Sequence, residues 1–482
     1  MKVCIIAEGC YPYVVGGVSS WLQMILEGMP DVDFTVFTIA VDESQRGQFK
    51  YTLPANVTAV QENFLMSDRG AYNAGRRRRR KKPLPPPHAL TLRSLVMSAE
   101  EIPWKAVCEI VHAPDFDASA YLNGCDFFNA AKERYRRDGI NCPFSDYLWT
   151  LRSMFQPMFT LLTWKIPEAD IYHAVSAGYA GVAGALGSAL YGSPFLLSEH
   201  GIYTREREEE LIRSTWTKGY FKDMWIRHFY SLSAFAYEQA DTVVSLFHQN
   251  AEAQEDLGCV PDKIRIIPNG VSVESYRDVK PSRHPDGIVN IGAVVRVTPI
   301  KDIKTMILAF HEVKARLPST RFYIMGSGDE DPEYYQECLD LIEQLDMRDI
   351  ELTGRINIRD YLPDMDILVL TSISEGQPLA ILEGMLFRKP WVATNVGCCR
   401  QLLYGAPGDG EGQAGFVAPV MDVQKLARYI LRLANDADMR REMGETGYRR
   451  ACKYYRLEDM FEAYSSLYQE LGVAKWPVLV SS

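Results

Sequence analysis

The sequence predicts an α/β protein with two doubly wound parallel sheets, each covered by helices. Its 482 residues exceed the length of one ordinary domain, and 47% of them are hydrophobic, which is enough for more than one core. Short apolar runs alternate with amphipathic stretches along most of the chain, as in repeated β-α-β units. This alternation stops in a polar, proline-rich segment at 281–287 and then begins again. We therefore expect a first domain over residues 1–280 and a second over residues 281–455.

The first domain opens with a short apolar strand at Val3–Ala7. The pair Gly16-Gly17 follows, the amphipathic stretch Val18–Met29 predicts a helix, and Phe34–Ile39 predicts the next strand. Further buried strands of this domain are expected at Ile171–Ala174, Phe195–Ser198, Thr242–Leu246 and Ile264–Ile267.

The alternation breaks between about residues 64 and 163, which we interpret as an insertion. The unbroken basic run Arg76–Lys82 and the prolines up to Pro87 cannot enter a core, so they predict an exposed loop. The rest of the insertion is expected to be helical. The basic run suits an anionic membrane surface or a membrane partner, although a solvated loop explains it equally well.

The second domain repeats the order of strand and helix. Strands are expected at Val289–Val294, Arg321–Met325, Ile350–Thr353, Ile367–Thr371 and Pro390–Thr394, and helices at Ile303–Ala315, Glu333–Leu345, Pro378–Phe387 and Val423–Ala434. Residues 456–482 form a tail in which Leu457–Leu471 has helical spacing, and we expect this helix to pack back across the two domains. Doubly wound sheets bind ligands beyond the carboxyl ends of their strands, so the functional site is expected there.

Composition excludes several classes of protein. A net charge of −10 argues against a nucleic-acid binder, and ten cysteines without any Cys-x-x-Cys pair give no zinc framework and favour a reducing compartment. The first apolar run is too short for a signal peptide. The uncharged stretch Ala174–Ser198 is rich in glycine, alanine and serine, so it predicts a packed helix followed by a strand rather than a membrane span. We therefore expect a cytoplasmic protein.

The strongest chemical signal is a pair of glutamates, Glu375 and Glu383, which stand eight positions apart across a strand-to-helix turn. Gly376 permits close backbone approach at this turn. The free N–H groups of Leu379 and Ala380 would then face an anionic phosphate, while both carboxylates could accept hydroxyl hydrogens of a sugar or ribose. A solvated pair of glutamates on an unremarkable helix start fits the same spacing.

A second signal is Arg296 and Lys301, which follow the expected strand Val289–Val294. Two cations at a strand end can hold a diphosphate and neutralise the charge of a leaving group. The alternative interpretation is that Arg296 and Lys301 are ordinary exposed basic side chains near a turn. No Asp-x-Asp stands beside other plausible metal ligands, so we expect no metal.

These features occur in the order seen in family 4 glycosyltransferases, and the chain resembles that family across most of its length. The shared segments are Glu-x7-Glu, the upstream Arg296 and Lys301, Gly16-Gly17-Val18, Pro268-Asn269-Gly270-Val271 and Gly326-Ser327-Gly328. The resemblance implies a GT-B fold with two Rossmann-like domains facing across a cleft. It also implies a retaining reaction, a UDP-sugar donor and neither a required metal nor another cofactor. Segments 7–12, 16–21, 198–206 and 399–403 resemble most those members that build an exopolysaccharide with a membrane export complex, which would act at the inner face of the cell membrane.

The resemblance assigns roles to individual residues. Arg296 and Lys301 match the pair that binds the donor diphosphate, Glu383 matches the carboxylate on the nucleotide ribose, and Glu375 the one facing the donor sugar. The expected donor-binding set is completed by Gly17, Gly376, Leu379, Ala380 and Gly326.

His200 matches a histidine placed near the reacting sugar. A lone histidine is more often structural, but this one follows the strand Phe195–Ser198 at the edge where such folds hold functional groups. We therefore expect His200 to be catalytic, together with Glu375, Arg296 and Lys301. Its neighbour Glu199 is expected to orient other groups.

The chain departs from the family at Gly397-Cys398-Cys399, where many relatives carry an acidic residue soon after two glycines. The cysteine pair suggests either redox control or, more simply, packed thiols. Two other functions stay open: a GT-B-fold UDP-sugar epimerase, which would need no acceptor, and a non-catalytic scaffold that senses the donor in an export complex.

Overall fold

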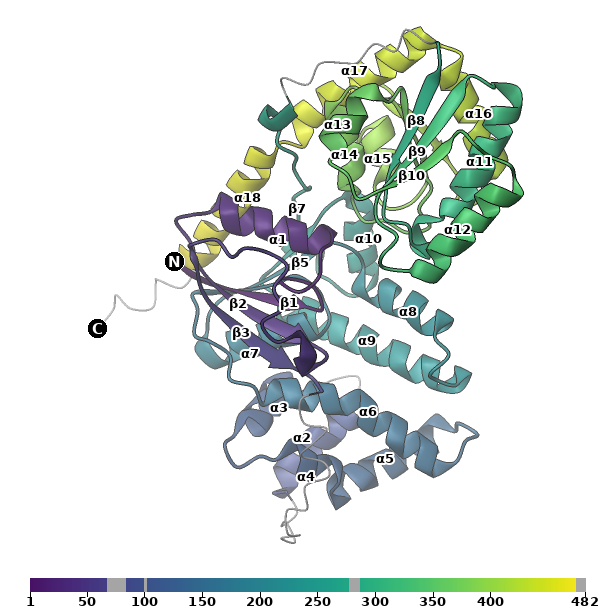
Figure 1. Ribbon diagram of the computed structural model, residues 1–482. Helices are drawn as coiled ribbons and strands as arrows, with labels where there is room; N and C mark the ends of the chain where they lie inside the picture. Colours follow the sequence, from purple (N-terminus) through teal and green to yellow (C-terminus); the bar gives the residue numbers. More distant parts are fainter. Residues whose placement is uncertain (67–83, 99–101, 277–286, 474–482) are drawn as a thin grey trace. The chain divides into compact units, whose positions relative to one another are not determined.

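The computed structural model describes residues 1–66, 84–98, 102–276 and 287–473, and the chain divides into two compact units (Figure 1). The first unit comprises Met1–Ile266 together with the chain from Tyr464 onward, and the second comprises Ile267–Ala463. The basic run Arg76–Lys82 and nearly all of the proline-rich segment at 281–287 lie outside the described residues. In the described part of the chain, no helix combines the length and apolarity that a membrane crossing needs.

The first unit is built on a parallel sheet with the strand order β3-β2-β1-β4-β5-β6-β7. Its strands are β1 (Lys2–Glu8), β2 (Asp33–Ala40), β3 (Val57–Phe64), β4 (Ile171–Ala174), β5 (Phe195–Glu199), β6 (Thr242–Ser245) and β7 (Ile264–Ile266). The helices outside the insertion are α1 (Gly17–Gly28), α7 (Tyr179–Tyr191), α8 (Tyr203–Arg213), α9 (Gly219–Gln239), α10 (His248–Asp256) and the later turns of α18 (Leu457–Val473). The strand order reverses between β1 and β4, which makes their carboxyl ends the topological switch point of this sheet.

The uncharged stretch after β4 forms the helix α7 and the strand β5, as expected for a packed interior segment. Helix α7 is buried over most of its length because glycines let it approach the sheet closely. A Cβ atom on Gly184 would lie 2.3 Å from the ring of Phe195, and one on Gly187 would lie 2.5 Å from the ring of Tyr172. The low hydrophobicity of this segment therefore reflects tight helix–sheet packing.

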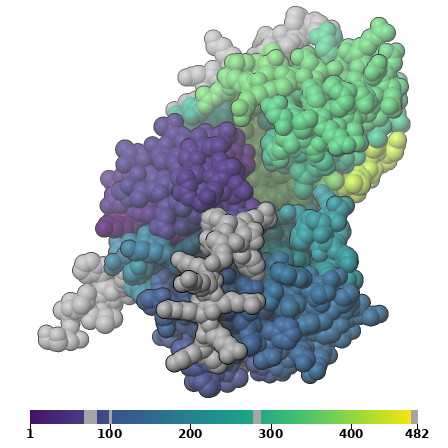
Figure 2. Space-filling view, turned by 60° about the horizontal axis from the view of Figure 1, so that its bottom comes forward, coloured from purple at the N-terminus to yellow at the C-terminus, as the bar shows by residue number. Residues whose placement is uncertain are grey.

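In the described part of the segment between β3 and β4, five helices form the helical part of the insertion, which is the blue region in the space-filling view (Figure 2). They are α2 (Pro86–Val96), α3 (Trp104–His112), α4 (Ala118–Leu122), α5 (Cys125–Asp138) and α6 (Phe144–Leu162). Their apolar faces join the core of the first unit through residues such as Phe127, Phe155 and Phe159. Strand β3 was not expected, because most of it is exposed or half-buried at the sheet edge and carries little apolar signal.

The second unit repeats the design with a parallel sheet in the order β10-β9-β8-β11-β12-β13. Its strands are β8 (Val289–Val294), β9 (Thr320–Met325), β10 (Ile350–Gly354), β11 (Ile367–Leu370), β12 (Trp391–Thr394) and β13 (Gly415–Ala418). Its helices are α11 (Ile303–Arg316), α12 (Pro332–Gln344), α13 (Ile358–Tyr361), α14 (Leu379–Leu386), α15 (Cys399–Tyr404), α16 (Val423–Ala434), α17 (Ala437–Tyr454) and the first turns of α18. The switch point of this sheet lies between β8 and β11. The prediction of two doubly wound parallel sheets is confirmed.

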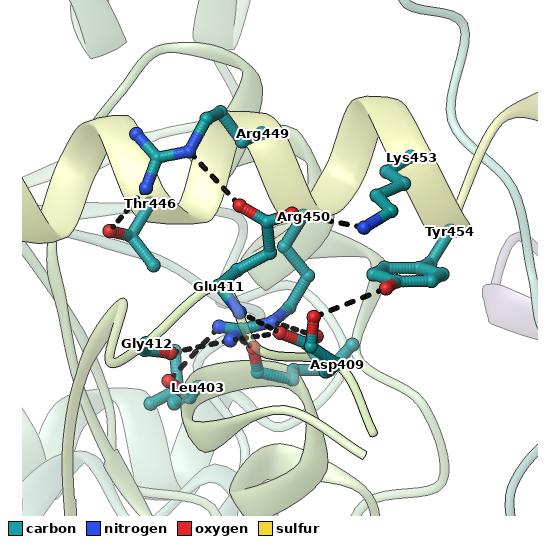
Figure 3. A network of polar contacts seen from close by, with 10 residues as sticks. Leu403, Asp409, Glu411, Gly412, Thr446, Arg449, Arg450, Lys453 and Tyr454 are labelled. Carbon is teal, nitrogen blue, oxygen red and sulfur yellow. Dashed lines mark hydrogen bonds and ion pairs between the residues drawn. The ribbon is translucent and has the colours of Figure 1, made fainter. Parts of the chain in front are cut away.

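A buried ion pair fastens the long loop between α15 and β13 to helix α17 (Figure 3). The side chain of Arg450 is fully buried, and its Nε and Nη2 donate to the two carboxylate oxygens of Asp409 at 2.6 and 3.0 Å. The same guanidinium donates to the carbonyls of Leu402, Leu403 and Gly412. One side chain therefore satisfies acceptors at both ends of this loop.

We predict that Arg450→Met destabilises the second unit by about 3 to 5 kcal/mol, because it leaves the buried Asp409 carboxylate unpaired. Thermal unfolding followed by calorimetry measures the effect. The matched control is Arg449→Met one position earlier, whose half-exposed side chain pairs with Glu411, and it should cost less than about 1 kcal/mol. Equal losses for the two variants would contradict this account.

Candidate functional site

The loop after β8 is held against the loop after β9 by backbone hydrogen bonds. The N–H groups of Val295 and Val297 donate to the carbonyls of Met325 and Ser327 at 3.0 and 2.9 Å. Gly326 lies between these two acceptors, and a Cβ atom on it would come within 1.8 Å of the carbonyl oxygen of Val295. Glycine is therefore required at this position by close backbone packing.

Arg296 projects from this loop with its side chain about half exposed. Its guanidinium forms an ion pair with Glu330 in the loop after β9. An exposed ion pair of this kind contributes little stability, so the guanidinium can change partner at small cost when an anion arrives.

Lys301 occupies a tightly built turn. It ends a short 3₁₀ turn at Pro299–Lys301, and Asp302 follows in the left-handed region with φ of 48°. The Thr371 hydroxyl, just after β11, donates to the carbonyls of Lys301 and Asp302 at 2.9 and 3.0 Å. This contact ties the loop after β8 to the end of β11, across the switch point of the sheet.

Lys301 and Glu375 form the central pair of the site. Lys301 Nζ donates to Glu375 Oε1 at 2.6 Å, and the side chains are only 16% and 11% exposed. Ser372 Oγ donates to the same carboxylate oxygen at 2.6 Å. The structure thus brings together two residues that the sequence placed in separate motifs.

The turn that carries Glu375 and Gly376 is supported from behind by the loop after β12. The N–H of Cys398 donates to the carbonyl of Gly376 at 3.0 Å. Gly397 has φ of 48°, and a Cβ atom there would lie 2.2 Å from the Gly376 carbonyl oxygen. This role of Gly397 was not predicted from the sequence. The residue type, glycine, was the only indication of a backbone constraint at this position.

The thiols of Cys398 and Cys399 are buried and free, with exposures of 1% and 0%. Burial raises the pKa of both thiols well above the ordinary value. The ionised, reactive form of either cysteine is therefore disfavoured. Of the two interpretations, packed thiols fit Cys398 and Cys399.

Helix α14 begins at Leu379 without a side-chain cap, so its first turn, with Leu379 and Ala380, has backbone N–H groups suited to an anion. Gln377, two positions before the helix, is buried and accepts a hydrogen bond through Oε1 from the N–H of Asn269 at 2.6 Å. This bond fastens the Pro268–Gly270 segment to the start of α14. Gln377 and Asn269 are contacts that the motif pattern did not reveal.

Glu383 lies on α14, one turn beyond Leu379. Burial raises the pKa of its carboxyl to about 7, while the positive charge of Arg359 acts in the opposite direction. This carboxyl therefore titrates near neutrality.

His200 follows β5 in the first unit, and its ring lies edge-on to Trp21 of α1 with centroids 4.3 Å apart. Its Nε2 is buried and has no hydrogen-bond partner among the described residues. Burial lowers the pKa of the imidazole to about 4, so it is neutral at physiological pH. A neutral ring with an unused nitrogen can bind a sugar hydroxyl.

Gly17 is the first residue of α1, directly after the loop that follows β1. A Cβ atom on Gly16 or Gly17 would meet nothing within 4 Å, so packing within the chain does not demand glycine there.

Two glutamates organise the loops of the first unit. Glu199 is buried and accepts hydrogen bonds from the Tyr203 N–H, the Tyr237 hydroxyl and the Gln254 amide at 2.9, 2.6 and 2.9 Å. Burial raises the pKa of Glu199.

At the end of β1, Glu8 accepts from the Ser176 hydroxyl, the Ala180 N–H and the Tyr203 hydroxyl. The role of Glu8 was not predicted from the sequence, although a charged residue at the end of an apolar strand could have indicated it.

The expected site residues therefore fall in two groups. Those of the second unit surround the switch point between β8 and β11, and those of the first unit follow β1 and β5. Among the described residues, no three histidine, cysteine, aspartate or glutamate side chains cluster in a way that could hold a metal ion.

Comparison with known proteins assigns a family model to each half of the chain. Residues 1–262 match the family described as "Domain of unknown function (DUF3492)", and residues 286–436 match "Glycosyl transferases group 1". An N-acetyl-alpha-D-glucosaminyl L-malate synthase of Bacillus anthracis is 22% identical over 249 residues, which cover 50% of this chain and 62% of that protein. An alpha-maltose-1-phosphate synthase of Mycolicibacterium smegmatis is 22% identical over 321 residues, or 61% of this chain and 77% of that protein.

Solved structures show the same fold. HepE of Anabaena, determined with UDP, has a TM-score of 0.60 and 14% identity, with 98% of this chain and 100% of that chain covered. Sucrose-phosphate synthase of Thermosynechococcus elongatus has a TM-score of 0.61 at 14% identity, with the same coverage. The chain therefore belongs to the DUF3492 family over its first half, carries a glycosyl transferases group 1 domain in its second, and is a glycosyltransferase with the GT-B fold.

Proposed function

We propose that the enzyme transfers a sugar from a UDP-sugar to a growing exopolysaccharide, with retention of configuration and without a metal. The observation that carries this proposal is the Lys301–Glu375 pair at the switch point of the second sheet, beside the uncapped start of α14. Three solved HepE structures of the same fold contain UDP or UDP-glucose, which favours a uridine nucleotide as donor.

Departure of UDP leaves negative charge on the diphosphate and positive character on the sugar. Lys301, Arg296 and the N–H groups of Leu379 and Ala380 are the donors available to that charge, and fixed donors stabilise it most effectively. Glu375 pairs with Lys301 and holds the ammonium in place for the diphosphate. Glu375 then faces the donor sugar, and the acceptor attacks from the same side as the leaving group.

The acceptor is proposed from sequence similarity to the Pel exopolysaccharide glycosyltransferase PelF. The supporting segments are 7–12, 16–21, 198–206 and 399–403. On this proposal the enzyme works at the inner face of the cell membrane with a polysaccharide export complex. Two alternative functions would give different products from a transferase. A UDP-sugar epimerase would release an altered sugar without an acceptor, and a donor-sensing scaffold would bind the donor without converting it.

We predict that Lys301→Ala weakens UDP-sugar binding about 10- to 100-fold, because one charge-assisted contact to the diphosphate is lost and Glu375 is left unpaired. Calorimetric titration in EDTA with UDP-, ADP- and GDP-sugars measures this loss and the base preference. The matched control is Lys304→Ala on the next helix, whose exposed ammonium pairs with Glu337 and which should bind like the wild type. Wild-type affinity in Lys301→Ala would reject the donor site, and a requirement for added metal would reject metal independence.

We also predict that His200→Ala lowers kcat about 100-fold while the affinity for UDP stays within about twofold, since the neutral ring acts on the sugar and not on the nucleotide. Because burial lowers the pKa of His200 to about 4, the ring is already neutral above that pH and its titration should not appear in kcat between pH 6 and 8. Release of UDP measures turnover, with His248→Ala, an exposed residue at the start of α10, as the control. An unchanged kcat in His200→Ala would show that His200 has no catalytic role.

A further inference from the structure

Four aromatic rings form a buried cluster in the first unit, where α1, β4, the end of β5 and α18 meet. Trp21 of α1 lies at its centre and is 1% exposed. The indole ring is edge-on to the rings of His200, Tyr464 and His173, with centroids 4.3, 5.4 and 6.1 Å apart. Tyr464 belongs to the part of α18 that packs in this unit. Trp21 therefore links the C-terminal helix to His200 through ring contacts.

One side of this cluster is fixed by hydrogen bonds. His173 forms hydrogen bonds through both ring nitrogens, each 2.7 Å long, with the hydroxyls of Tyr468 and Ser198. The hydroxyl of Ser198 also forms a 3.1 Å hydrogen bond with that of Tyr464, whose ring stacks on His173 at an interplanar angle of 25°. These four side chains belong to residues at most 1% exposed. A buried network whose members are paired rigidifies them, so the Tyr464 ring is held in one place.

The other side of the cluster, His200 and Trp21, is oriented by packing. Neither Nε2 of His200 nor Nε1 of Trp21 has a hydrogen-bond partner among the described residues. The last torsion of a histidine side chain is soft, so neighbouring groups have to set the angle of a ring whose Nε2 is unpaired. The edge-on indole is in a geometry that aromatic pairs favour. It limits the rotation of His200, and it rests in turn on the fixed ring of Tyr464.

We propose that Tyr464 and Trp21 are positioning residues for His200: the anchored tyrosine ring supports the indole, and the indole holds the imidazole at the angle from which Nε2 reaches the donor sugar. This inference rests on the proposed function, in which the neutral ring of His200 acts on the sugar. Loss of the support should lower kcat and leave nucleotide affinity unchanged, because a small misplacement of a reacting group slows a reaction strongly.

The test measures kcat from UDP release and the affinity for UDP by calorimetric titration, using the full chain with UDP-glucose and UDP-N-acetylglucosamine as donors. Tyr464→Leu removes the ring that supports Trp21. It should lower kcat about tenfold, with the UDP affinity within about twofold of wild type. Tyr464→Phe keeps the ring and loses only the hydroxyl, so its kcat should stay within about twofold of wild type.

Tyr468→Leu is the matched control, one turn later on α18. Tyr468 is as buried as Tyr464 and joins the same hydrogen-bond network, but its ring contacts Phe34, His173 and Tyr464 rather than Trp21. This variant should lower the melting temperature about as much as Tyr464→Leu does and keep kcat within about twofold of wild type. Equal losses of kcat in the two leucine variants, at a temperature at which both are folded, would overturn the inference.

A double-mutant cycle tests whether the effect passes through His200. In a His200→Ala background, Tyr464→Leu should change kcat by less than about twofold, since the ring to be positioned is gone. A further loss of about tenfold there would overturn the inference and leave the proposed function standing.

Trp21→Phe, which has a smaller ring against His200, keeps the cycle decisive if Tyr464→Leu does not fold. It should lower kcat about threefold in the wild-type background and leave it unchanged in His200→Ala. A wild-type kcat in Trp21→Phe, or the same loss in both backgrounds, would overturn the inference. A wild type that releases no UDP from either donor would overturn the proposed function as well.

Discussion

The contact between Lys301 Nζ and Glu375 Oε1 is the interaction on which the arrangement of the site depends. It joins the loop after β8 to the turn after β11 with a 2.6 Å bond between two nearly buried charges. Leaving either charge unpaired in this place is costly, so the two loops are constrained to stay together. The hydroxyls of Thr371 and Ser372 add further contacts at the same strand end.

Strand order explains why these loops meet. Strand β8 is the first strand of the second sheet. Strands β9 and β10 are added on one side of β8, and β11 then pairs with the other side of β8. Helices that follow β8 and β11 therefore leave opposite faces of the sheet, and the loops between strand and helix are free to hold charged groups. The same reversal between β1 and β4 puts Glu8 at the corresponding point of the first sheet.

The fold was largely predictable because each β-α unit has a local signature. The buried strands β8, β11 and β12 are apolar runs, and α16 shows regular helical spacing of its buried residues Leu426, Ile430 and Leu433. Strands β3 and β13 escaped prediction: β3 is an edge strand that buries few of its residues, and β13 has only four residues. The site motifs were visible as residue types, whereas the backing of Gly376 by the Cys398 N–H was not, since a backbone donor leaves no mark in a side-chain pattern.

By itself the sequence determined the two doubly wound sheets, the loops that carry charge and the family that these loops resemble. Such features depend on residues within a few positions of one another, where periodicity and turn chemistry act. Only the tertiary structure decided that Lys301 pairs with a glutamate 74 positions away, and that the side chain of Gln377 accepts a hydrogen bond from the N–H of Asn269, 108 positions earlier. The reason is physical: strand order brings these segments together, and burial then sets the strength of each charge interaction and the pKa of each group.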